Sequence, residues 1–226
     1  MKFKAIAKAS LALGMLATGV VTSNTESVQA KTEVKQQSES DLKYYYSGPS
    51  FEYKKVTGYN YIYGGKHFLE VIVGDQYSRI SLLGSDKDKF KEGVNQDLDV
   101  FIVREGLGKQ ADNFSDGGVT KTNSKPYIDY INTPILEIKS GNKESQSSLY
   151  YIYKEDISLK ELDFKLRKQL ISQYGLYSNN HKNGQITITM KDGSSHSIDL
   201  SKKLEKERMS ESIDGREIQK IQVEIK

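Results

Sequence analysis

Side chains that could catalyse a reaction are few in this chain and stand far apart. It contains no cysteine, and His67, His181 and His196 lack the spacing of a metal site. Ser197 follows His196 directly, but neighbouring side chains of a strand point to opposite faces, so these two do not begin a catalytic triad. The motifs HExxH and GxSxG and a phosphate-binding glycine loop are absent from the sequence. We therefore predict a binding protein that is not an enzyme and needs neither a cofactor nor a metal.

Tyrosine is the residue type that stands out, with 15 copies in a chain that has no tryptophan. Many of them gather near the predicted start of the fold: Tyr44, Tyr45, Tyr46, Tyr53, Tyr59, Tyr61 and Tyr63. Tyrosine provides rigid, amphipathic contact area, which predicts a protein-binding patch with Tyr45, Tyr59 and Tyr61 as candidate contacts. The structural alternative is that these rings pack on half-buried strand faces, where tyrosine is also favoured.

The most fully specified element that could position such residues is a helix predicted for residues 158–174. Ser158 and Glu161 have the spacing of a capping box at its start. One apolar face follows from spacings of three and four: Leu159, Leu162, Leu166 and Leu170. Its lysines are predicted to face water: Lys160, Lys165 and Lys168. The helix is therefore amphipathic, and Asp163 and Arg167 form an ion pair one turn apart on its flank.

Five candidate strands are predicted before Asn123. The first two form a hairpin around Gly64–Gly65, a strong signal for a two-residue turn. In order, the elements are strands Phe51–Tyr63, Lys66–Val73 and Gln76–Leu83, a short helix Ser85–Gly93, strand Asp97–Arg104, a loop Lys109–Asp116 and a strand opening at Gly117. Short strands with one small helix between the third and the fourth have the order of an OB-fold barrel.

Loop-forming residues at 123–126 mark a predicted boundary between two domains. The elements predicted after it are a strand Tyr127–Lys139, in which Pro134 suggests an edge or a bulge, a loop Ser140–Ser148, a strand Leu149–Tyr153, the helix, a hairpin of Gln185–Lys191 with Ser194–Leu200, and a last strand Ile218–Ile225. At the other end, a disordered leader, 31–40, is predicted to precede a short helix at 41–46.

The first 30 residues have the pattern of a secretory signal peptide. Three lysines precede an apolar run over 9–21, and small residues stand before a cleavage position after Ala30. The run is shorter than the roughly 20 residues that span a bilayer, so we expect a secreted, extracellular product without membrane insertion. Removing three lysines and one glutamate from 33 basic and 30 acidic residues leaves 30 and 29, a balance that gives no support to a nucleic-acid partner.

The stretch 154–177 resembles the second signature of the staphylococcal and streptococcal superantigen family, whose fixed positions are filled by Lys154, Ile157, Leu162, Asp163, Arg167, Leu170, Leu176 and Tyr177. Within that family the chain resembles the superantigen-like, or exotoxin-like, branch. The resemblance implies a mixed α+β architecture, with an N-terminal OB-fold β-barrel, 41–125, followed by a C-terminal β-grasp domain, 126–226. It also implies a secreted virulence factor that binds host defence molecules.

Two departures from the family pattern argue against superantigen activity. Relatives that bridge class II molecules have a zinc-binding His-x-Asp pair on the last strand, where this chain has Gln222, Val223 and Glu224. In the family's other signature, Asp116 replaces a tyrosine, and Asn123 comes after two intervening residues instead of four. We therefore expect no T-cell mitogenic activity.

One subgroup of the superantigen-like branch binds sialylated glycans through a β-grasp hairpin and a nearby arginine. The resemblance makes Ser197, Asp199 and Arg208 the candidate glycan-binding residues, which offer a hydroxyl, an acceptor and a fork-shaped donor suited to a carboxylate. The aromatic residue and the threonine of the subgroup are missing from the matching strand. The alternative is that Arg208 only pairs with Glu205 or Glu211 on a helical turn.

The favoured interpretation is a secreted immune-evasion protein that binds a host immune or extracellular-matrix protein and blocks the interactions of that protein. The alternatives are a lectin for the sialylated glycans of leukocyte glycoproteins and an inhibitor of a host protease. We expect a monomer or a weak homodimer. The sequence does not choose among the host targets.

Overall fold

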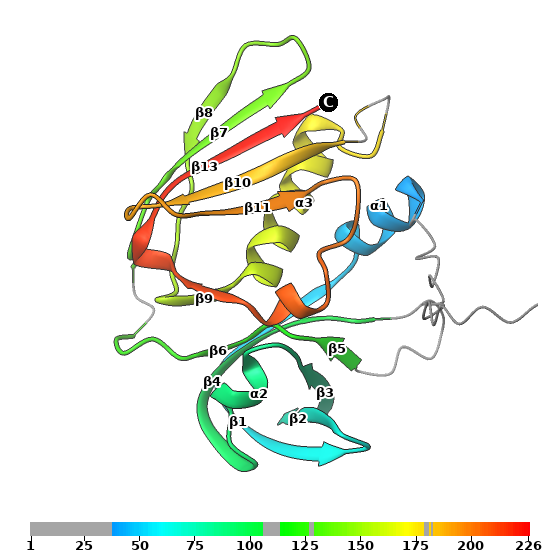
Figure 1. Cartoon of the computed structure of the whole chain (residues 1–226), viewed down its shortest axis with the longest axis vertical. Helices are drawn as coiled ribbons and strands as arrows, with labels where there is room; N and C mark the ends of the chain where they lie inside the picture. Colours follow the sequence, from blue (N-terminus) through cyan, green and yellow to red (C-terminus); the bar gives the residue numbers. More distant parts are fainter. Residues whose placement is uncertain (1–37, 106–113, 127–128, 179–180, 182) are drawn as a thin grey trace, which may run out of the picture. The chain divides into compact units, whose positions relative to one another are not determined.

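The computed structural model describes residues 38–105, 114–126, 129–178, 181 and 183–226 (Figure 1). All of them belong to one compact unit, Gln36–Lys226. The predicted signal peptide, 1–30, lies outside the described residues, as does most of the predicted leader.

The described chain opens with helix α1 (Glu39–Ser47), which begins two residues before the predicted start. Ser38 and Asp41 form a capping box that satisfies the first backbone N–H groups of the helix. Leu42 and Tyr46 are buried and attach the helix to the core. Residues 38–40 are therefore structured and do not belong to a disordered leader.

The first domain is built on one sheet of six strands in the order β5-β3-β2-β1-β4-β6. Its elements are β1 (Ser50–Tyr63), β2 (Lys66–Val73), β3 (Gln76–Leu82), α2 (Asp86–Lys89), β4 (Gly93–Val103), β5 (Phe114–Asp116) and β6 (Val119–Lys121). The predicted hairpin is present, and Gly64 and Gly65 have the positive φ values, 56° and 73°, that its tight turn needs. The backbone N–H of Glu105 donates to the carbonyl of Phe114 (2.9 Å), which brings the end of β4 to β5 and curls the sheet into a barrel.

Two predictions for this domain were wrong in detail. The predicted loop Lys109–Asp116 ends in strand β5, whose three residues are too few to give a visible alternation. Strand β4 begins at Gly93, four residues before the predicted start, because its first residues pair with β1 beyond a β-bulge.

In the second domain, helix α3 (Leu159–Tyr174) lies across one face of a five-stranded sheet in the order β11-β10-β13-β7-β8 (Figure 1). The other elements are β7 (Ile135–Ser140), β8 (Gln146–Leu149), β9 (Asp156–Ser158), β10 (Gly184–Met190), β11 (Ser195–Asp199), η1 (Glu207–Ser210), β12 (Ser212–Asp214), η2 (Gly215–Glu217) and β13 (Ile218–Ile225). The pairing of β13 with β7 is parallel, and the predicted hairpin forms from β10 and β11. The predicted leucine face of α3 packs into the core of this domain.

The strands around β7 and β8 differ from the prediction. Residues 127 and 128 of the predicted strand Tyr127–Lys139 lie outside the described residues. Of the described part, the strand is β7, which begins after Pro134, a residue without a backbone N–H to donate. Strand β8 occupies the end of the predicted loop Ser140–Ser148. It was not predicted because its four exposed, mostly polar residues show no apolar alternation. Of the predicted strand Leu149–Tyr153, Leu149 is the last residue of β8 and Ile152 forms an isolated bridge with Asn132.

Helix α3 also carries the polar contacts that join the two domains. Lys160 was predicted to face water but is 2% exposed, because the barrel covers this side of the helix. Its ammonium donates to Ser115 Oγ (2.7 Å) and to the carbonyl of Asp116 (2.5 Å), and burial lowers the pKa of Lys160 to about 8. Tyr46 donates to Asp163 Oδ2 (2.6 Å) from α1.

The predicted capping box at the start of α3 is only half formed. Ser158 Oγ accepts from the backbone N–H of Glu161 (3.1 Å), but the Glu161 carboxylate turns to Lys154 Nζ (2.7 Å). Lys154 also lies 3.6 Å from Glu52 of the barrel. Glu161 therefore takes part, through Lys154, in the contact between the two domains.

Candidate functional site

The outer face of strands β1 to β3 carries the exposed tyrosines. Tyr59 is 53% exposed and Tyr63 is 76% exposed, and Tyr61 lies between them on the same side of β1. The register places Tyr61 opposite Phe68 and Tyr59 opposite Glu70 on β2. Two of the three predicted patch residues therefore lie side by side on an accessible sheet face.

A hydrogen-bond network centred on Glu70 fixes the rings of this face. Glu70 Oε1 accepts from the hydroxyls of Tyr61 (2.9 Å) and Tyr77, and from Arg79 Nη2 (3.2 Å). The guanidinium of Arg79 lies 6.0 Å from the ring centroids of both Tyr61 and Phe68. These hydrogen bonds, that of Tyr77 first, lower the pKa of Glu70 and keep the carboxylate ionised at neutral pH. We call Tyr59, Tyr61, Phe68, Glu70, Tyr77 and Arg79 the barrel face.

Four members of the barrel face were missed by the sequence reasoning. Their signal was the alternation in β2 and β3, where exposed or half-buried residues interleave with buried ones such as Leu69 and Ile80. An aromatic residue and an acid on the same side of one strand, with an arginine on the next, could have indicated a shared face.

Tyr45, the third predicted patch residue, does not lie beside Tyr59 and Tyr61. Its ring packs edge to face against Tyr46 (4.9 Å) and Phe164 (6.0 Å), and its hydroxyl donates to Glu105 Oε1 (3.0 Å). Burial raises the pKa of Tyr45 well above its usual value. Tyr45 therefore lies apart from Tyr59 and Tyr61, because α1 turns its ring toward α3.

The candidate glycan-binding residues come together in the second domain. Ser197 and Asp199 lie on the exposed side of β11, and Arg208 Nη1 donates to the carbonyl of Ser197 (2.7 Å) from η1. The ion pairs named in the predicted alternative are present as well, since Arg208 lies 3.8 Å from Glu205 and 3.5 Å from Glu211. We call Ser197, Asp199 and Arg208 the hairpin face.

Asp199 of the hairpin face is already engaged by its own chain. Its Oδ1 accepts from the backbone N–H of Ser201 (2.8 Å) and from the Ser201 hydroxyl (2.7 Å). Its backbone carbonyl accepts from Arg167 Nη2 (2.9 Å), so the buried arginine of α3 holds the end of β11 in place.

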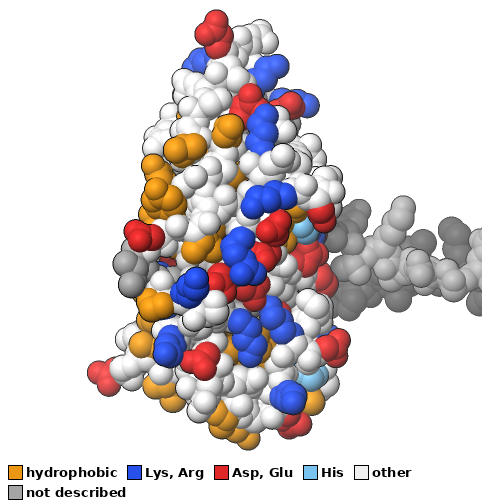
Figure 2. Space-filling view, turned by 90° about the vertical axis from the view of Figure 1, so that its left-hand side faces the viewer, with side chains coloured by type: hydrophobic (Ala, Val, Ile, Leu, Met, Phe, Trp, Pro, Cys, Tyr) orange, Lys and Arg blue, Asp and Glu red, His pale blue; other side chains and the backbone are white. Residues whose placement is uncertain are grey.

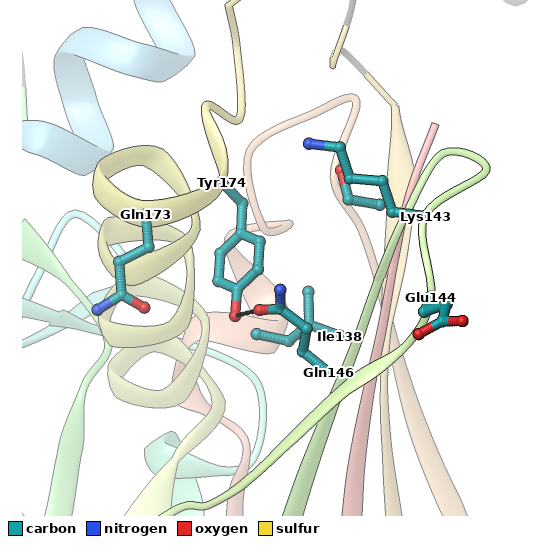
Figure 3. Close-up of a pocket in the computed structure, with 7 residues that line it drawn as sticks. Ile138, Lys143, Glu144, Gln146, Gln173 and Tyr174 are labelled. Carbon is teal, nitrogen blue, oxygen red and sulfur yellow. Dashed lines mark hydrogen bonds between the residues drawn. The ribbon is translucent and has the colours of Figure 1, made fainter.

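A small cavity of about 350 Å³ lies between the end of α3 and the β7–β8 hairpin (Figure 3). Tyr174 closes one side, where its hydroxyl donates to Gln146 Oε1 (2.9 Å). The charged groups of its lining are Lys143 and Glu144.

Exposed apolar side chains also gather beside β7 and β8. Ile135 and Leu149 are opposite each other in the register and are 50% and 54% exposed. The rings of Tyr130 and Tyr151 lie 5.3 Å apart. The sequence reasoning missed this patch, although the run from Leu149 to Tyr153 was its signal. Figure 2 shows one face of the molecule, where hydrophobic side chains line the left edge and charges of both signs mix over the rest.

No group of three or more His, Asp or Glu side chains in the described part of the chain is placed to hold a metal ion. No helix among the described residues is long and apolar enough to cross a membrane.

Two family models match the chain. Residues 40–123 match the staphylococcal superantigen-like OB-fold domain, and residues 131–225 match the staphylococcal/streptococcal toxin β-grasp domain. These matches confirm the predicted fold class and the order of the domains. The predicted boundary at residue 125 falls between the matched ranges.

Similar proteins cover the same length. Staphylococcal superantigen-like 1 from Staphylococcus aureus strain Newman is 70% identical over 226 residues, which are 100% of both chains. The crystal structure of exotoxin 6 from Staphylococcus aureus Mu50 has a TM-score of 0.82 at 70% identity, covering 84% of this chain and 100% of that one. The structure of the superantigen-like protein SSL5 with sialyl Lewis X at pH 4.6 has a TM-score of 0.78 at 44% identity, covering 83% and 100%.

Proposed function

The chain belongs to the staphylococcal superantigen-like family, and from this premise we propose that it is a secreted virulence factor that binds a host immune protein. It acts by occupying a surface of that protein and so blocks the protein's next encounter. The proposal assigns no catalytic role to any residue. It also excludes superantigen activity, because Gln222 and Glu224 stand on β13 where class II-binding relatives have a zinc-binding pair.

The observation that carries this proposal is the barrel face. Large aromatic side chains there remain accessible, with Tyr59 at 53% and Tyr77 at 38% exposure, in a folded chain that buries most of its apolar residues. The hydrogen bonds to Glu70 already fix Tyr61 and Arg79, so little side-chain entropy is lost when a partner binds. Aromatic and arginine side chains of this kind commonly supply the largest share of interface energy.

The test is capture of host proteins from human serum and neutrophil lysate, with and without sialidase treatment. We expect one or a few proteins to be captured equally from treated and untreated samples. Tyr59→Ala should weaken this capture, whereas Tyr44→Ala should not. Tyr44 is the matched control, because it is a 68% exposed tyrosine on α1 rather than on the sheet. Capture that is insensitive to Tyr59→Ala would contradict the proposal.

Sialylated-glycan binding is the second candidate function, and a specific observation favours it. SSL5 has been crystallised with sialyl Lewis X, and this chain brings Arg208 against Ser197 on the hairpin face. A guanidinium beside a hydroxyl and an acceptor suits a sugar carboxylate. The arginine would first have to exchange its contacts with Glu205 and Glu211.

Binding to immobilised sialyl Lewis X tests the second candidate. A glycan site predicts binding that is lost in Arg208→Ala and kept in Arg216→Ala, which removes a guanidinium that is paired with Asp214 away from the hairpin face. An unchanged response in Arg208→Ala would exclude this site. A stoichiometric complex at the active-site face of a host protease would instead support the inhibitor alternative.

A further inference from the structure

A groove of about 720 Å³ opens where the barrel face meets the second domain. The rings of Tyr61 and Phe68, 5.7 Å apart, form one wall, and Leu82 and Phe114 contribute apolar lining. Lys206, at the start of η1, reaches it from the second domain and pairs with Asp116 (3.0 Å). The volume lies in the range of sites that bury a ligand rather than a bound water.

The charged lining of this groove is predominantly basic. It contains one carboxylate, that of Asp116, and four cationic side chains: Lys66, Arg79, Lys87 and Lys206. Arg79 and Lys206 already have acidic partners, whereas Lys66 and Lys87 have no ion-pair partner among the described residues. The accessible positive charge therefore favours an anionic occupant.

His67 also lines the groove, but its Nδ1 is buried and is therefore not open to an occupant. The groove thus combines apolar walls with lysines that have no ion-pair partner among the described residues.

We propose that this groove binds an acidic peptide segment that also carries an aromatic or aliphatic side chain. The carboxylates meet Lys66 and Lys87, and the apolar side chain covers Phe68 and Leu82. A sulfated polysaccharide would satisfy the lysines but has no side chain to cover the apolar wall, so the peptide fits better. The inference rests on the proposed function, because it names the partner chemistry at the edge of the same barrel face.

The test measures fluorescence anisotropy of a labelled short peptide of alternating glutamate and tyrosine, titrated with the full chain. Two matched probes alternate lysine with tyrosine and glutamate with serine. We expect the glutamate–tyrosine peptide to bind at least roughly tenfold more tightly than either control, and added salt to weaken it. Equal binding of the three peptides would overturn the proposal.

The double variant Lys66→Glu with Lys87→Glu should weaken the glutamate–tyrosine peptide roughly tenfold. Lys91→Glu with Lys125→Glu makes the same charge change at exposed lysines that do not line the groove, and should leave the affinity unchanged. All four lysines are exposed, so thermal melting should confirm that both variants remain folded. A Kd that is the same for both double variants would overturn the proposal.

Three further outcomes separate the groove from the proposed function. If heparin binds through Lys66 and Lys87 while the glutamate–tyrosine peptide does not bind, the groove recognises sulfate and the peptide proposal falls. If a serum protein is lost on Tyr59→Ala but is kept by Lys66→Glu with Lys87→Glu, the proposed function stands and the groove proposal falls. If the chain captures no host protein, the proposed function fails whatever the peptide does.

Discussion

The barrel face and the hairpin face are organised in different ways. On the barrel face, one carboxylate accepts from two tyrosines and an arginine, and the rings above it stay accessible. On the hairpin face, Arg208 is held between two glutamates and a backbone carbonyl, and Asp199 is occupied by Ser201. The barrel face is ready for a partner, whereas the hairpin face must first exchange internal contacts, and this difference is why we place protein binding on the barrel.

The largest expected effect on stability comes from Arg167, the buried arginine that supports the hairpin face. Arg167→Ala removes the ion-pair partner of the buried Asp163 (2.6 Å), which keeps its hydrogen bond from Tyr46, and frees the carbonyl of Asp199, so we expect a loss of about 3–5 kcal/mol in the free energy of unfolding. Urea unfolding measures it. Arg167→Lys keeps the charge but not the forked guanidinium, so its free energy of unfolding should lie between those of Arg167→Ala and the parent. A loss below about 1 kcal/mol would show that Arg167 does not hold β11.

The second prediction concerns Asp86 of α2, a fully buried acid in the barrel. Burial raises the pKa of Asp86 to about 7, above its unfolded value of about 3.9. The protonated form therefore favours folding, and the stability that this group contributes below pH 4 is lost as pH rises through about 7.

Comparison with Asp86→Asn isolates this dependence. Between pH 4 and pH 8 the free energy of unfolding of the parent should fall relative to that of the variant, by on the order of 4 kcal/mol. Denaturant unfolding at several pH values measures the difference. A difference that does not vary with pH would mean that Asp86 titrates normally.

A smaller effect is expected from Glu70, whose carboxylate fixes the rings of the barrel face. Glu70→Gln removes the charge that attracts Arg79 but retains an acceptor for Tyr61 and Tyr77, so the rings become less firmly fixed. We expect affinity for the captured host protein to fall by about 1 kcal/mol, roughly fivefold, mostly through faster dissociation. Surface plasmon resonance measures the two rates. Glu137→Gln, on β7, is the matched control and should leave both rates unchanged.

The smallest expected effect belongs to the hairpin face itself. Arg208→Ala removes partly exposed ion pairs, so the free energy of unfolding should change by less than about 1 kcal/mol. Host-protein capture should persist. Thermal melting and capture on the same preparation check both statements, and a large loss of capture with an unchanged melt would move the binding site to this face.

The parts of the fold that depend on local pattern could be predicted from the sequence. The leucines of α3, the glycines of the β1–β2 turn and the alternation in β13 each define their element without help from distant residues. Strand β8 could not be found this way, because its pairing with β7, not its own composition, makes it a strand. Lys160 appears solvent-facing in a helical pattern and is buried only because the other domain covers it.

The candidate sites likewise combine features that local sequence patterns predict with features that only the tertiary fold creates. Tyr59 and Tyr61 share a face because they are two residues apart on one strand, which the sequence shows. The contact of Arg208 with Ser197 joins η1 to β11. The groove gathers residues from β1, β2, β3, α2 and β5, and Lys206 just before η1. Contacts between elements so far apart in the chain come from the tertiary fold.

The most direct test of the central claim is quantitative capture from sialidase-treated human serum by two variants in parallel. One is Tyr59→Ala with Tyr61→Ala on the barrel face, and the other is Arg208→Ala on the hairpin face. We predict that the first variant loses the captured host protein by at least roughly tenfold while the second keeps it. The opposite result, with capture kept by the tyrosine variant and lost by Arg208→Ala, would contradict the assignment of protein binding to the barrel face.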